Sequence, residues 1–245
     1  MTSQIALVTG AGRGIGQAIA HRLADAGYFV IASDRKGGLA EETIGQIGPE
    51  RGRAVELDVT DRTAVAAVVN ATVAEFGGLH LAVSNAMWIR YAPLSEVSES
   101  DVDRMVDVGV KGPLWMAQAL QEPMRRQGGG SIVNIASVAA LLSTPNAAVY
   151  SAVKGALVSL TRQLAGDLGT DNIRVNAIAP GTIDTPGARV AMSDEARDHR
   201  RNRAPLGRLG LPADIAEAVL YLGGPASSFV TGQLLTVDGG ITARM

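Results

Sequence analysis

Short apolar segments recur along the chain and alternate with longer segments of helical periodicity. The short segments are nearly continuous in apolar residues, which is typical of strands buried on both faces of a sheet. They span residues 5–9, 28–32, 54–57, 80–84, 131–136, 173–179 and 234–237. The clearest helical segments span residues 15–26, 62–76, 98–127, 151–168 and 212–222. Because strands and helices alternate, the pattern predicts one α/β domain over residues 1–245 with a parallel sheet covered on both faces.

The predicted helix over residues 98–127 contains glycine where helices normally avoid it. Ser98 followed by Asp101 is typical of an N-terminal cap. Gly109 and Gly112 nevertheless lie in the middle, although a glycine there costs about 1 kcal/mol relative to alanine. We therefore expect Gly109 to meet a requirement other than helix stability.

The least regular part of the chain spans residues 182–210, which are rich in polar, basic, Pro and Gly residues. Such a segment is either a solvated loop or a lid over a site. Its position directly after a predicted strand favours the lid, because ligands of open α/β sheets bind beyond the strand ends.

Composition excludes several function classes. The formal net charge is −2 and the arginines are scattered, so we expect neither a nucleic-acid nor a membrane-surface partner. The chain has no Cys, and its three histidines lie far apart, so neither a disulfide nor a metal site is expected. No apolar run reaches the length of a membrane-spanning helix, and the N-terminus lacks the pattern of a signal peptide. These features predict a cytoplasmic protein.

A glycine-rich turn, TGAGRGIG at residues 9–16, follows the first strand and opens the first helix. Gly10, Gly14 and Gly16 allow a tight turn and a close approach of a pyrophosphate to the helix N-terminus. The spacing departs from the strict dinucleotide fingerprint, and no Lys-Ser/Thr of a phosphate loop follows. A purely structural turn is the alternative.

An acidic residue at the end of the second strand favours a dinucleotide. Asp34 is placed to accept hydrogen bonds from adenosine ribose hydroxyls and to repel a 2′-phosphate, which predicts NAD rather than NADP. Three basic residues favour NADP instead, since they are able to pair with its 2′-phosphate: Arg13, Arg35 and Lys36.

Three residues with catalytic chemistry follow the fifth strand. Tyr150 and Lys154 are four apart in YSAVK, a spacing that puts both on one helix face. Ser137 ends the fifth strand, where α/β sheets bind ligands. A solvated helix face is the alternative interpretation of the Tyr-Lys pair.

Together these motifs resemble those of the classical short-chain dehydrogenase/reductase family. The resemblance covers essentially the whole chain in order and spacing. The matching motifs are TGAGRGIG, DVT (58–60), the asparagine of SNAM (84–87), Ser137, Tyr150, Lys154, PGTIDT (180–185), PLGRLGLPADIA (205–216) and TGQLLTVDGG (231–240). The resemblance implies a Rossmann-type, doubly wound sheet of seven parallel strands in a single domain.

The resemblance also implies roles for individual residues. Tyr150 would be the general acid/base, with its pKa lowered by Lys154 and the cofactor, and Ser137 would hold the substrate oxygen. Asp58 and Val59 would contact adenine, Asn85 and Ala86 the ribose, and Ile183 and Thr185 the carboxamide side. The full set expected to bind the cofactor is Gly10, Arg13, Gly14, Ile15, Gly16, Asp34, Arg35, Asp58, Val59, Asn85, Ala86, Tyr150, Lys154, Pro180, Gly181, Ile183 and Thr185.

Two positions depart from the family pattern. Met87 stands where the family has glycine, and with Trp88 and Ile89 it belongs either to the substrate pocket or to the core. Gly109 stands where the family has an asparagine that holds a helix kink and a proton-relay water. Glycine keeps the kink, because it tolerates irregular backbone, but supplies no side chain. We hypothesise an altered relay through a backbone carbonyl near Gly109; drift at a dispensable position is the alternative.

The expected function is hydride transfer between NAD(H) and a secondary alcohol or ketone, with Ser137 and Tyr150 on the substrate. The alternatives are an NADPH-dependent 3-oxoacyl reductase and a non-catalytic, cofactor-binding regulatory protein. The segments expected to shape the substrate pocket, residues 87–91, 138–145 and 186–192, are mostly apolar. Arg90 and Arg189 either bind an anion or are solvated, and solvation is favoured. The resemblance further implies a homo-oligomer, a dimer or tetramer, formed through the helices after strands four and five.

Overall fold

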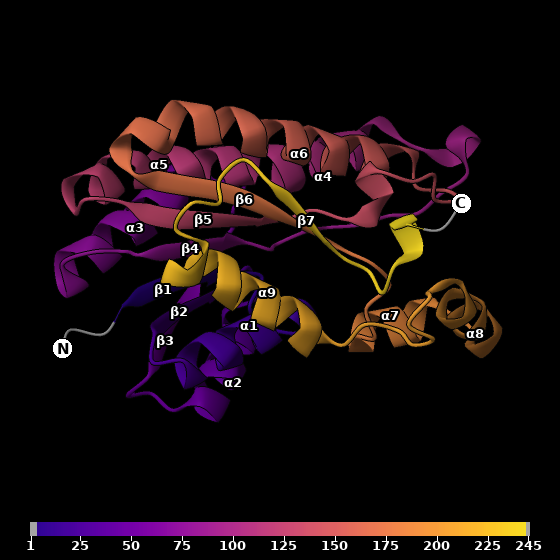
Figure 1. Cartoon of the computed structure of the whole chain (residues 1–245), viewed down its shortest axis with the longest axis horizontal. Helices are drawn as coiled ribbons and strands as arrows, with labels where there is room; N and C mark the ends of the chain where they lie inside the picture. The colour runs from indigo at the N-terminus through magenta and orange to yellow at the C-terminus, as the bar shows by residue number, and fades with distance from the viewer. Residues whose placement is uncertain (1–3, 244–245) are drawn as a thin grey trace.

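Seven parallel strands form one sheet in the computed structural model, which describes residues 4–243 (Figure 1). The strands are β1 (Ile5–Thr9), β2 (Phe29–Asp34), β3 (Gly52–Glu56), β4 (Leu81–Ser84), β5 (Gly130–Ile135), β6 (Ile173–Pro180) and β7 (Leu234–Val237). Their order is β3-β2-β1-β4-β5-β6-β7. The chain runs outward from β1 to β3 and then returns to place β4 on the other side of β1. That reversal creates a crevice at the carboxyl ends of β1 and β4.

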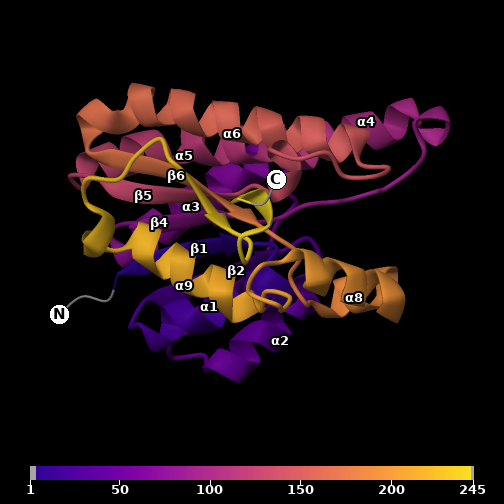
Figure 2. The same cartoon turned by 45° about the vertical axis from the view of Figure 1, so that its right-hand side comes forward.

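Helices cover both faces of the sheet (Figures 1 and 2). One face carries α3 (Arg62–Phe76), α5 (Gly112–Arg126) and α6 (Ala148–Leu168), and the other carries α1 (Gly14–Asp25), α2 (Gly37–Ile47) and α9 (Pro212–Gly223). Neighbouring residues of β1 point to opposite faces, as strand geometry requires. Leu7 packs in the cluster with Val69 and Leu120, and Val8 packs in the cluster with Ile19 and Val219. The predicted doubly wound, seven-stranded α/β fold is confirmed.

Helix α2 was not among the predicted helices. It begins with two glycines, contains a third at Gly45, and has no side-chain cap at its N-terminus. Glycine lowers helix propensity, so the local signal is weak. Ile44 and Ile47 are buried in the core on the α1 side of the sheet. Tertiary packing therefore stabilises a helix that local propensity does not mark.

The predicted helix over residues 98–127 changes geometry in its middle. It begins as α4 (Glu99–Val106) at a capping box, in which Asp101 N donates to Ser98 Oγ over 3.2 Å. It continues as a π-helical segment, η2 (Asp107–Lys111), and then as α5. Gly109 is the buried residue of this π-helical segment. Such segments are wider than the α-helix and are frequent at functional sites.

Residues 182–210 are more regular than predicted. They contain α7 (Pro186–Ala191) and α8 (Asp194–Arg203), which are capped by the side chains of Thr185 and Ser193. No residue of α8 is buried. The polar composition of this segment therefore reflects a solvated helix rather than irregular backbone. Figures 1 and 2 show both helices at the end of the molecule to which β6 leads.

Within residues 4–243, no helix has both the length and the apolar character that crossing a membrane requires.

Candidate active site

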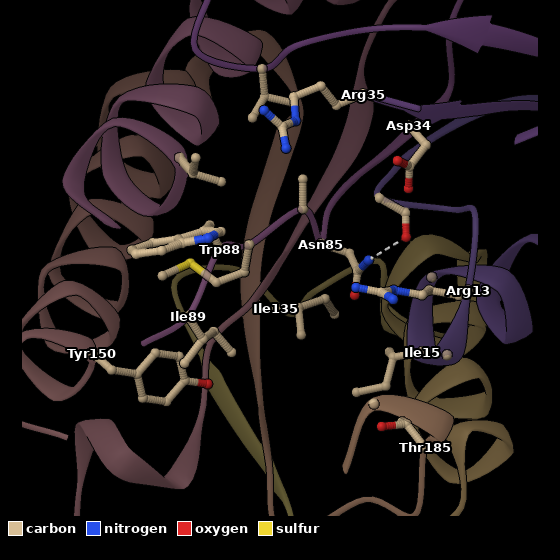
Figure 3. Close-up of a pocket in the computed structure, with 18 of the residues that line it drawn as sticks. Arg13, Ile15, Asp34, Arg35, Asn85, Trp88, Ile89, Ile135, Tyr150 and Thr185 are labelled. Carbon is tan, nitrogen blue, oxygen red and sulfur yellow. Dashed lines mark hydrogen bonds between the residues drawn. The ribbon is translucent and has the colours of Figure 1, made fainter. Parts of the chain in front are cut away.

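A cavity of about 780 Å³ opens at the carboxyl ends of the strands. Every residue of the expected cofactor-binding set lines it, together with Ser137: Gly10, Arg13, Gly14, Ile15, Gly16, Asp34, Arg35, Asp58, Val59, Asn85, Ala86, Ser137, Tyr150, Lys154, Pro180, Gly181, Ile183 and Thr185. Of the segments expected to shape the substrate pocket, residues 87–89 and 186–187 line the cavity, whereas residues 138–145 do not. In Figure 3, Tyr150 and Ile89 lie on the side opposite Arg13, Ile15 and Thr185. The cavity is large enough for a dinucleotide and a small substrate together.

The glycine-rich turn leaves an open cradle at the start of α1. Gly10 has a positive φ of 63°, and a Cβ there would lie 2.9 Å from Ala86 Cα. A Cβ on Gly16 would collide with the Gly10 carbonyl oxygen. Across from Gly14, by contrast, the nearest side chain is Thr185, at 3.5 Å from an ideal Cβ. The turn thus closes tightly on itself while leaving space at the helix N-terminus, where a pyrophosphate fits.

Asn85 holds this turn against the end of β4. Its Nδ2 donates to the carbonyl oxygens of Thr9 and Gly10, both over 3.0 Å. Thr9 Oγ1 in return accepts from the backbone N–H groups of Asn85 and Ala86, over 3.0 and 3.1 Å. Asn85 was expected at the ribose; it lines the cavity, but its amide N–H groups fix the turn. It therefore acts on the shape of the cradle.

Asp34 lies at the far end of the cavity and is fixed by the backbone. Its Oδ2 accepts from Gly12 N over 3.3 Å, and its Oδ1 accepts from Lys36 N over 3.0 Å. Each carboxylate oxygen retains a further lone pair that can accept a ribose hydroxyl. Arg35 and Lys36 line the same end of the cavity. The site therefore offers an acceptor for ribose hydroxyls, with cations beside it.

Asp58 faces the cavity beyond β3. Its Oδ1 accepts from Thr60 N and from Thr60 Oγ1, over 3.0 and 2.7 Å. Partial burial opposes its ionisation, but these hydrogen bonds and the charges of Arg35 and Arg104 bring its pKa below the ordinary value. Asp58 is therefore an ionised acceptor at neutral pH, suited to an amino group.

Tyr150 and Lys154 lie one turn apart on α6 and both face the cavity. Tyr150 is 9% exposed and its hydroxyl points into the cavity (Figure 3). Lys154 is 4% exposed, and its Nζ lies 5.8 Å from the centre of the Tyr150 ring. Ser137 lies two residues beyond the end of β5, and its Oγ accepts from Ala139 N over 3.1 Å. Because that bond uses a lone pair, the Ser137 hydrogen stays available for a substrate oxygen.

In the protein without cofactor, burial determines the acidities of the pair, and the lowering of the Tyr150 pKa expected from Lys154 and the cofactor together stays a prediction. Burial raises the pKa of Tyr150 to about 12; Tyr91 adds to the rise, and hydrogen bonding with Ser137 opposes it. Burial lowers the pKa of Lys154 to about 8. The Lys154 ammonium donates to the Ile135 carbonyl oxygen over 2.7 Å, but the loss of water around the buried charge has the larger effect on its pKa. In the protein alone, therefore, Tyr150 is a protonated phenol at neutral pH.

The two departures from the family pattern meet in space. A Cβ on Gly109 would lie 2.9 Å from Met87 Sδ, and it would collide with Val153 Cγ1. Met87 lines the cavity, yet it also packs against the buried cluster that contains Tyr150 and Val153. The substrate pocket and the core were the alternative locations expected for Met87. The structure shows that its side chain lines the cavity and packs against the core at the same time. The proposed water relay near Gly109 stays a prediction.

Arg104 is a cavity residue that the sequence analysis did not identify. Its guanidinium lies 4.4 Å from the centre of the Trp88 ring, and both residues line the cavity. An arginine on an exposed helix face gives no local signal of a site. Arg90 and Arg189, the anion-binding candidates, are paired with Asp101 and Asp184 at 3.2 and 2.9 Å.

Fold and site together define a dinucleotide-dependent α/β oxidoreductase: a phosphate cradle after β1 shares one cavity with a buried Tyr-Lys pair and a serine. A family profile described as enoyl-(acyl carrier protein) reductase matches residues 10–242. The chain belongs to the short-chain dehydrogenase/reductase family, whose members interconvert CH–OH and carbonyl groups with a nicotinamide cofactor.

Three relatives illustrate the similarity. The chain is 37% identical over 243 residues to cis-4-hydroxycyclohexanecarboxylate dehydrogenase of Sinomonas cyclohexanicum, covering 98% of this chain and 97% of the relative. It is 36% identical to the structure of a 3-ketoacyl-(acyl-carrier-protein) reductase from Brucella melitensis complexed with NADH, with a TM-score of 0.90 and 98% of both chains covered. It is 28% identical to ElxO with NADP bound, with a TM-score of 0.93 and 99% and 100% of the two chains covered.

Proposed function

We propose that this protein is an NAD-dependent dehydrogenase of secondary alcohols, working reversibly on the corresponding ketones. One observation carries the proposal: Ser137, Tyr150 and Lys154 share a single cavity with the glycine-rich cradle and Asp34. Asp34 would hold the adenosine ribose and the cradle at Gly14 the pyrophosphate, in the same cavity as Tyr150. When bound, the cofactor supplies or accepts the hydride.

The residues of the chain move the proton and hold the substrate oxygen. In reduction, the Tyr150 hydroxyl gives its proton to the carbonyl oxygen; in oxidation, the phenolate takes the proton of the alcohol. Ser137 donates a hydrogen bond to the same oxygen as charge develops on it. The Lys154 ammonium, in a water-poor site, would favour the phenolate and would hold a ribose hydroxyl of the bound cofactor.

An oxidised nicotinamide would add a positive charge near Tyr150, which favours the phenolate form of its side chain. The raised pKa of Tyr150 in the protein alone makes this contribution necessary, because a phenol with a pKa of about 12 is a poor base at neutral pH. We infer that Tyr150 becomes an effective base only in the cofactor complex.

NAD is the proposed cofactor because of Asp34. A 2′-phosphate placed there would meet a carboxylate already fixed by Gly12 N and Lys36 N. Arg13 and Arg35 also line the cavity and favour a phosphate, and ElxO has NADP bound. The carboxylate is the decisive group, because it is the one held in position by two backbone N–H groups.

The substrate we propose is a secondary alcohol with an apolar body. Ile89, Tyr91 and Leu141 are 43%, 53% and 49% exposed. Tyr91 packs edge-on against Tyr150 with 5.6 Å between ring centres. Ile89 lines the cavity and Tyr91 packs against Tyr150, so these two side chains offer apolar contact near the reacting oxygen. Residues 182–210, with α7 and α8, would act as the lid over this substrate; Thr185, Pro186 and Gly187 from this segment line the cavity.

A 3-oxoacyl reductase using NADPH is the second candidate. The similarity to the Brucella melitensis enzyme favours the 3-oxoacyl substrate but not NADPH, because that structure holds NADH. Turnover of a 3-oxoacyl thioester with NADPH in preference to NADH would support it. A homo-oligomer formed through α4, α5 and α6 is a further proposal, which light scattering of the purified protein tests.

The experiment measures turnover of secondary alcohols, polyols and hydroxyacyl esters, with NAD and NADP offered in parallel. We expect turnover with NAD that is lost in Tyr150→Phe and retained in Tyr221→Phe, which changes a tyrosine outside the cavity. Equal turnover by Tyr150→Phe would overturn the catalytic assignment. Binding of cofactor without turnover of any compound would instead favour a non-catalytic, cofactor-binding protein.

A further inference from the structure

Gly109 lies where the π-helical segment packs against Val153 of helix α6. An added Cβ would collide with Val153 Cγ1 and would lie 2.9 and 3.2 Å from Sδ and Cε of Met87. Real Cβ atoms do not tolerate contacts under 3.0 Å, so Val153 or the end of the Met87 side chain would have to shift. Glycine at this position therefore sets how near the two helices come.

Val153 transmits this contact to the reacting groups. It lies on α6 between Tyr150 and Lys154, is 3% exposed, and belongs to the same buried cluster as Tyr150. A displacement of Val153 away from Gly109 would carry the whole helical turn with it, because a helix moves as a rigid unit over one turn. The hydroxyl of Tyr150 and the ammonium of Lys154 would then move together.

Met87 is anchored on the cofactor side of the same contact. It follows Asn85 and Ala86, whose backbone N–H groups both donate to Thr9 Oγ1. Its thioether packs against the Tyr150 cluster. A continuous set of contacts thus runs from the glycine-rich turn through Met87 to the helical turn of Tyr150 and Lys154.

The position of Lys154 depends on the backbone of α6. Among residues 4–243, its ammonium donates to the Ile135 carbonyl oxygen over 2.7 Å and lies 5.8 Å from the centre of the Tyr150 ring. A shift of this turn of α6 would therefore change the distance of the ammonium from both groups.

We propose that Gly109 and Met87 are positioning residues that act through Val153 to set the Tyr150–Lys154 turn against the cofactor site. The inference rests on the proposed function, since it assumes that Tyr150 carries the proton. Neither residue is assigned a chemical step.

The chain contains a matched control. A Cβ on Gly130 would lie 2.5 Å from Sδ and 2.9 Å from Cε of Met124, so a second contact exists, between a half-buried glycine and a buried methionine. Gly130 begins β5, at the opposite end of the strand from Ser137. Substitutions there also disturb packing, but far from Tyr150.

The experiment compares Gly109→Ala, Met87→Ala and the double variant Gly109→Ala/Val153→Ala with Gly130→Ala, Met124→Ala and their double variant. Melting temperature, kcat, KM for NAD and the pH profile of kcat/KM are measured for each. We expect Gly109→Ala to lower kcat at least about tenfold, because small misplacements of reacting groups cost that much or more. The pH midpoint assigned to Tyr150 should move, while KM for NAD changes by less than about threefold.

The rescue distinguishes positioning from loss of stability. Truncating Val153 removes the atom with which the new Cβ collides, so the double variant should recover kcat and the wild-type pH midpoint, at least in part. Both glycine variants should lower the melting temperature, but Gly130→Ala should leave kcat and the pH midpoint near wild type. If Gly109→Ala fails to fold, the variants Met87→Ala and Met124→Ala are compared instead. Both open space in the packing, one next to the Tyr150 cluster and one far from it, so only Met87→Ala should change kcat and the pH midpoint.

Three results would overturn the inference. In the first, Gly109→Ala or Met87→Ala keeps the wild-type kcat and pH profile. In the second, Gly130→Ala lowers kcat as strongly, which indicates general destabilisation. In the third, the wild type turns over no alcohol, and the proposed function then fails as well. If Val153→Ala still restores the melting temperature of Gly109→Ala in that case, the contact between the two residues is purely structural.

Discussion

The ammonium of Lys154 donates a hydrogen bond to the carbonyl oxygen of Ile135 over 2.7 Å. This bond joins helix α6 to the end of β5, the strand that also carries Ser137 into the cavity. The ammonium is almost fully buried, and burial lowers its pKa to about 8. A cation held in this way destabilises the folded protein while it prepares the site for the phenolate.

The stability of the protein without cofactor should reflect this buried cation. Its folded pKa lies below the unfolded value of about 10.4, so the penalty is fully present below pH 8 and disappears as the pH rises through the interval between the two pKa values. Compared with Lys154→Met, the wild type should therefore gain stability from about pH 8 to about pH 10.5, by up to about 3 kcal/mol. Urea unfolding of both proteins across this range measures it. A constant difference between them would contradict the lowered pKa.

Tyr150 should titrate abnormally in the protein without cofactor. Burial raises its pKa to about 12, so the phenolate absorbance of wild type minus Tyr150→Phe should develop only well above the ordinary value of about 10. Because the folded pKa is raised, the wild type should also lose stability relative to Tyr150→Phe as the pH rises above about 10. Adding NAD should bring the titration to lower pH, since a nearby cation favours the phenolate. A midpoint near 10 without cofactor would contradict the effect of burial.

Replacing Asp34 should change the choice between cofactors. Asp34→Ser removes the negative charge and leaves Arg35 and Lys36 beside the ribose. We expect the ratio of kcat/KM for NAD to that for NADP to fall at least about tenfold, a difference of about 1.4 kcal/mol. Glu42→Gln, which removes an exposed acid outside the cavity, should leave the ratio unchanged. An unaltered ratio in Asp34→Ser would assign cofactor selection to the arginines instead.

Substitution of glycine by alanine should raise the stability of the protein at some positions and lower it at others. Gly45 in α2 and Gly166 in α6 have open space around an added Cβ and lie in helix interiors. Alanine there should stabilise the protein by about 0.5–1 kcal/mol, because glycine carries a conformational entropy cost in a helix. Gly16→Ala should destabilise it and abolish cofactor binding, because the new Cβ would meet the Gly10 carbonyl oxygen. Thermal unfolding with and without NAD separates the two classes.

Much of this molecule could be predicted from local patterns. Near-continuous apolar runs give the seven strands, because a strand buried on both faces has no polar side to present. The span of α3 matches the prediction at both ends, where the side chain of Asp61 caps its N-terminus and Gly77 follows its last residue with a left-handed φ of 77°. Helix α2 was not predicted, because its glycines lower the helix propensity of the segment. The burial of its apolar residues stabilises the helix in spite of that low propensity.

The sequence by itself determined the chemistry at the site: a turn that admits a phosphate, an acid after β2, and a tyrosine and lysine on one helix face. These features depend on spacing within one element, which the chain fixes locally. Only the tertiary structure decided that Met87 and Gly109 touch, that Asn85 fixes the turn, and that the phenol of Tyr150 is harder to ionise than an exposed one. Contacts between distant segments and the loss of water around a side chain arise when the elements pack together, so no local pattern contains them.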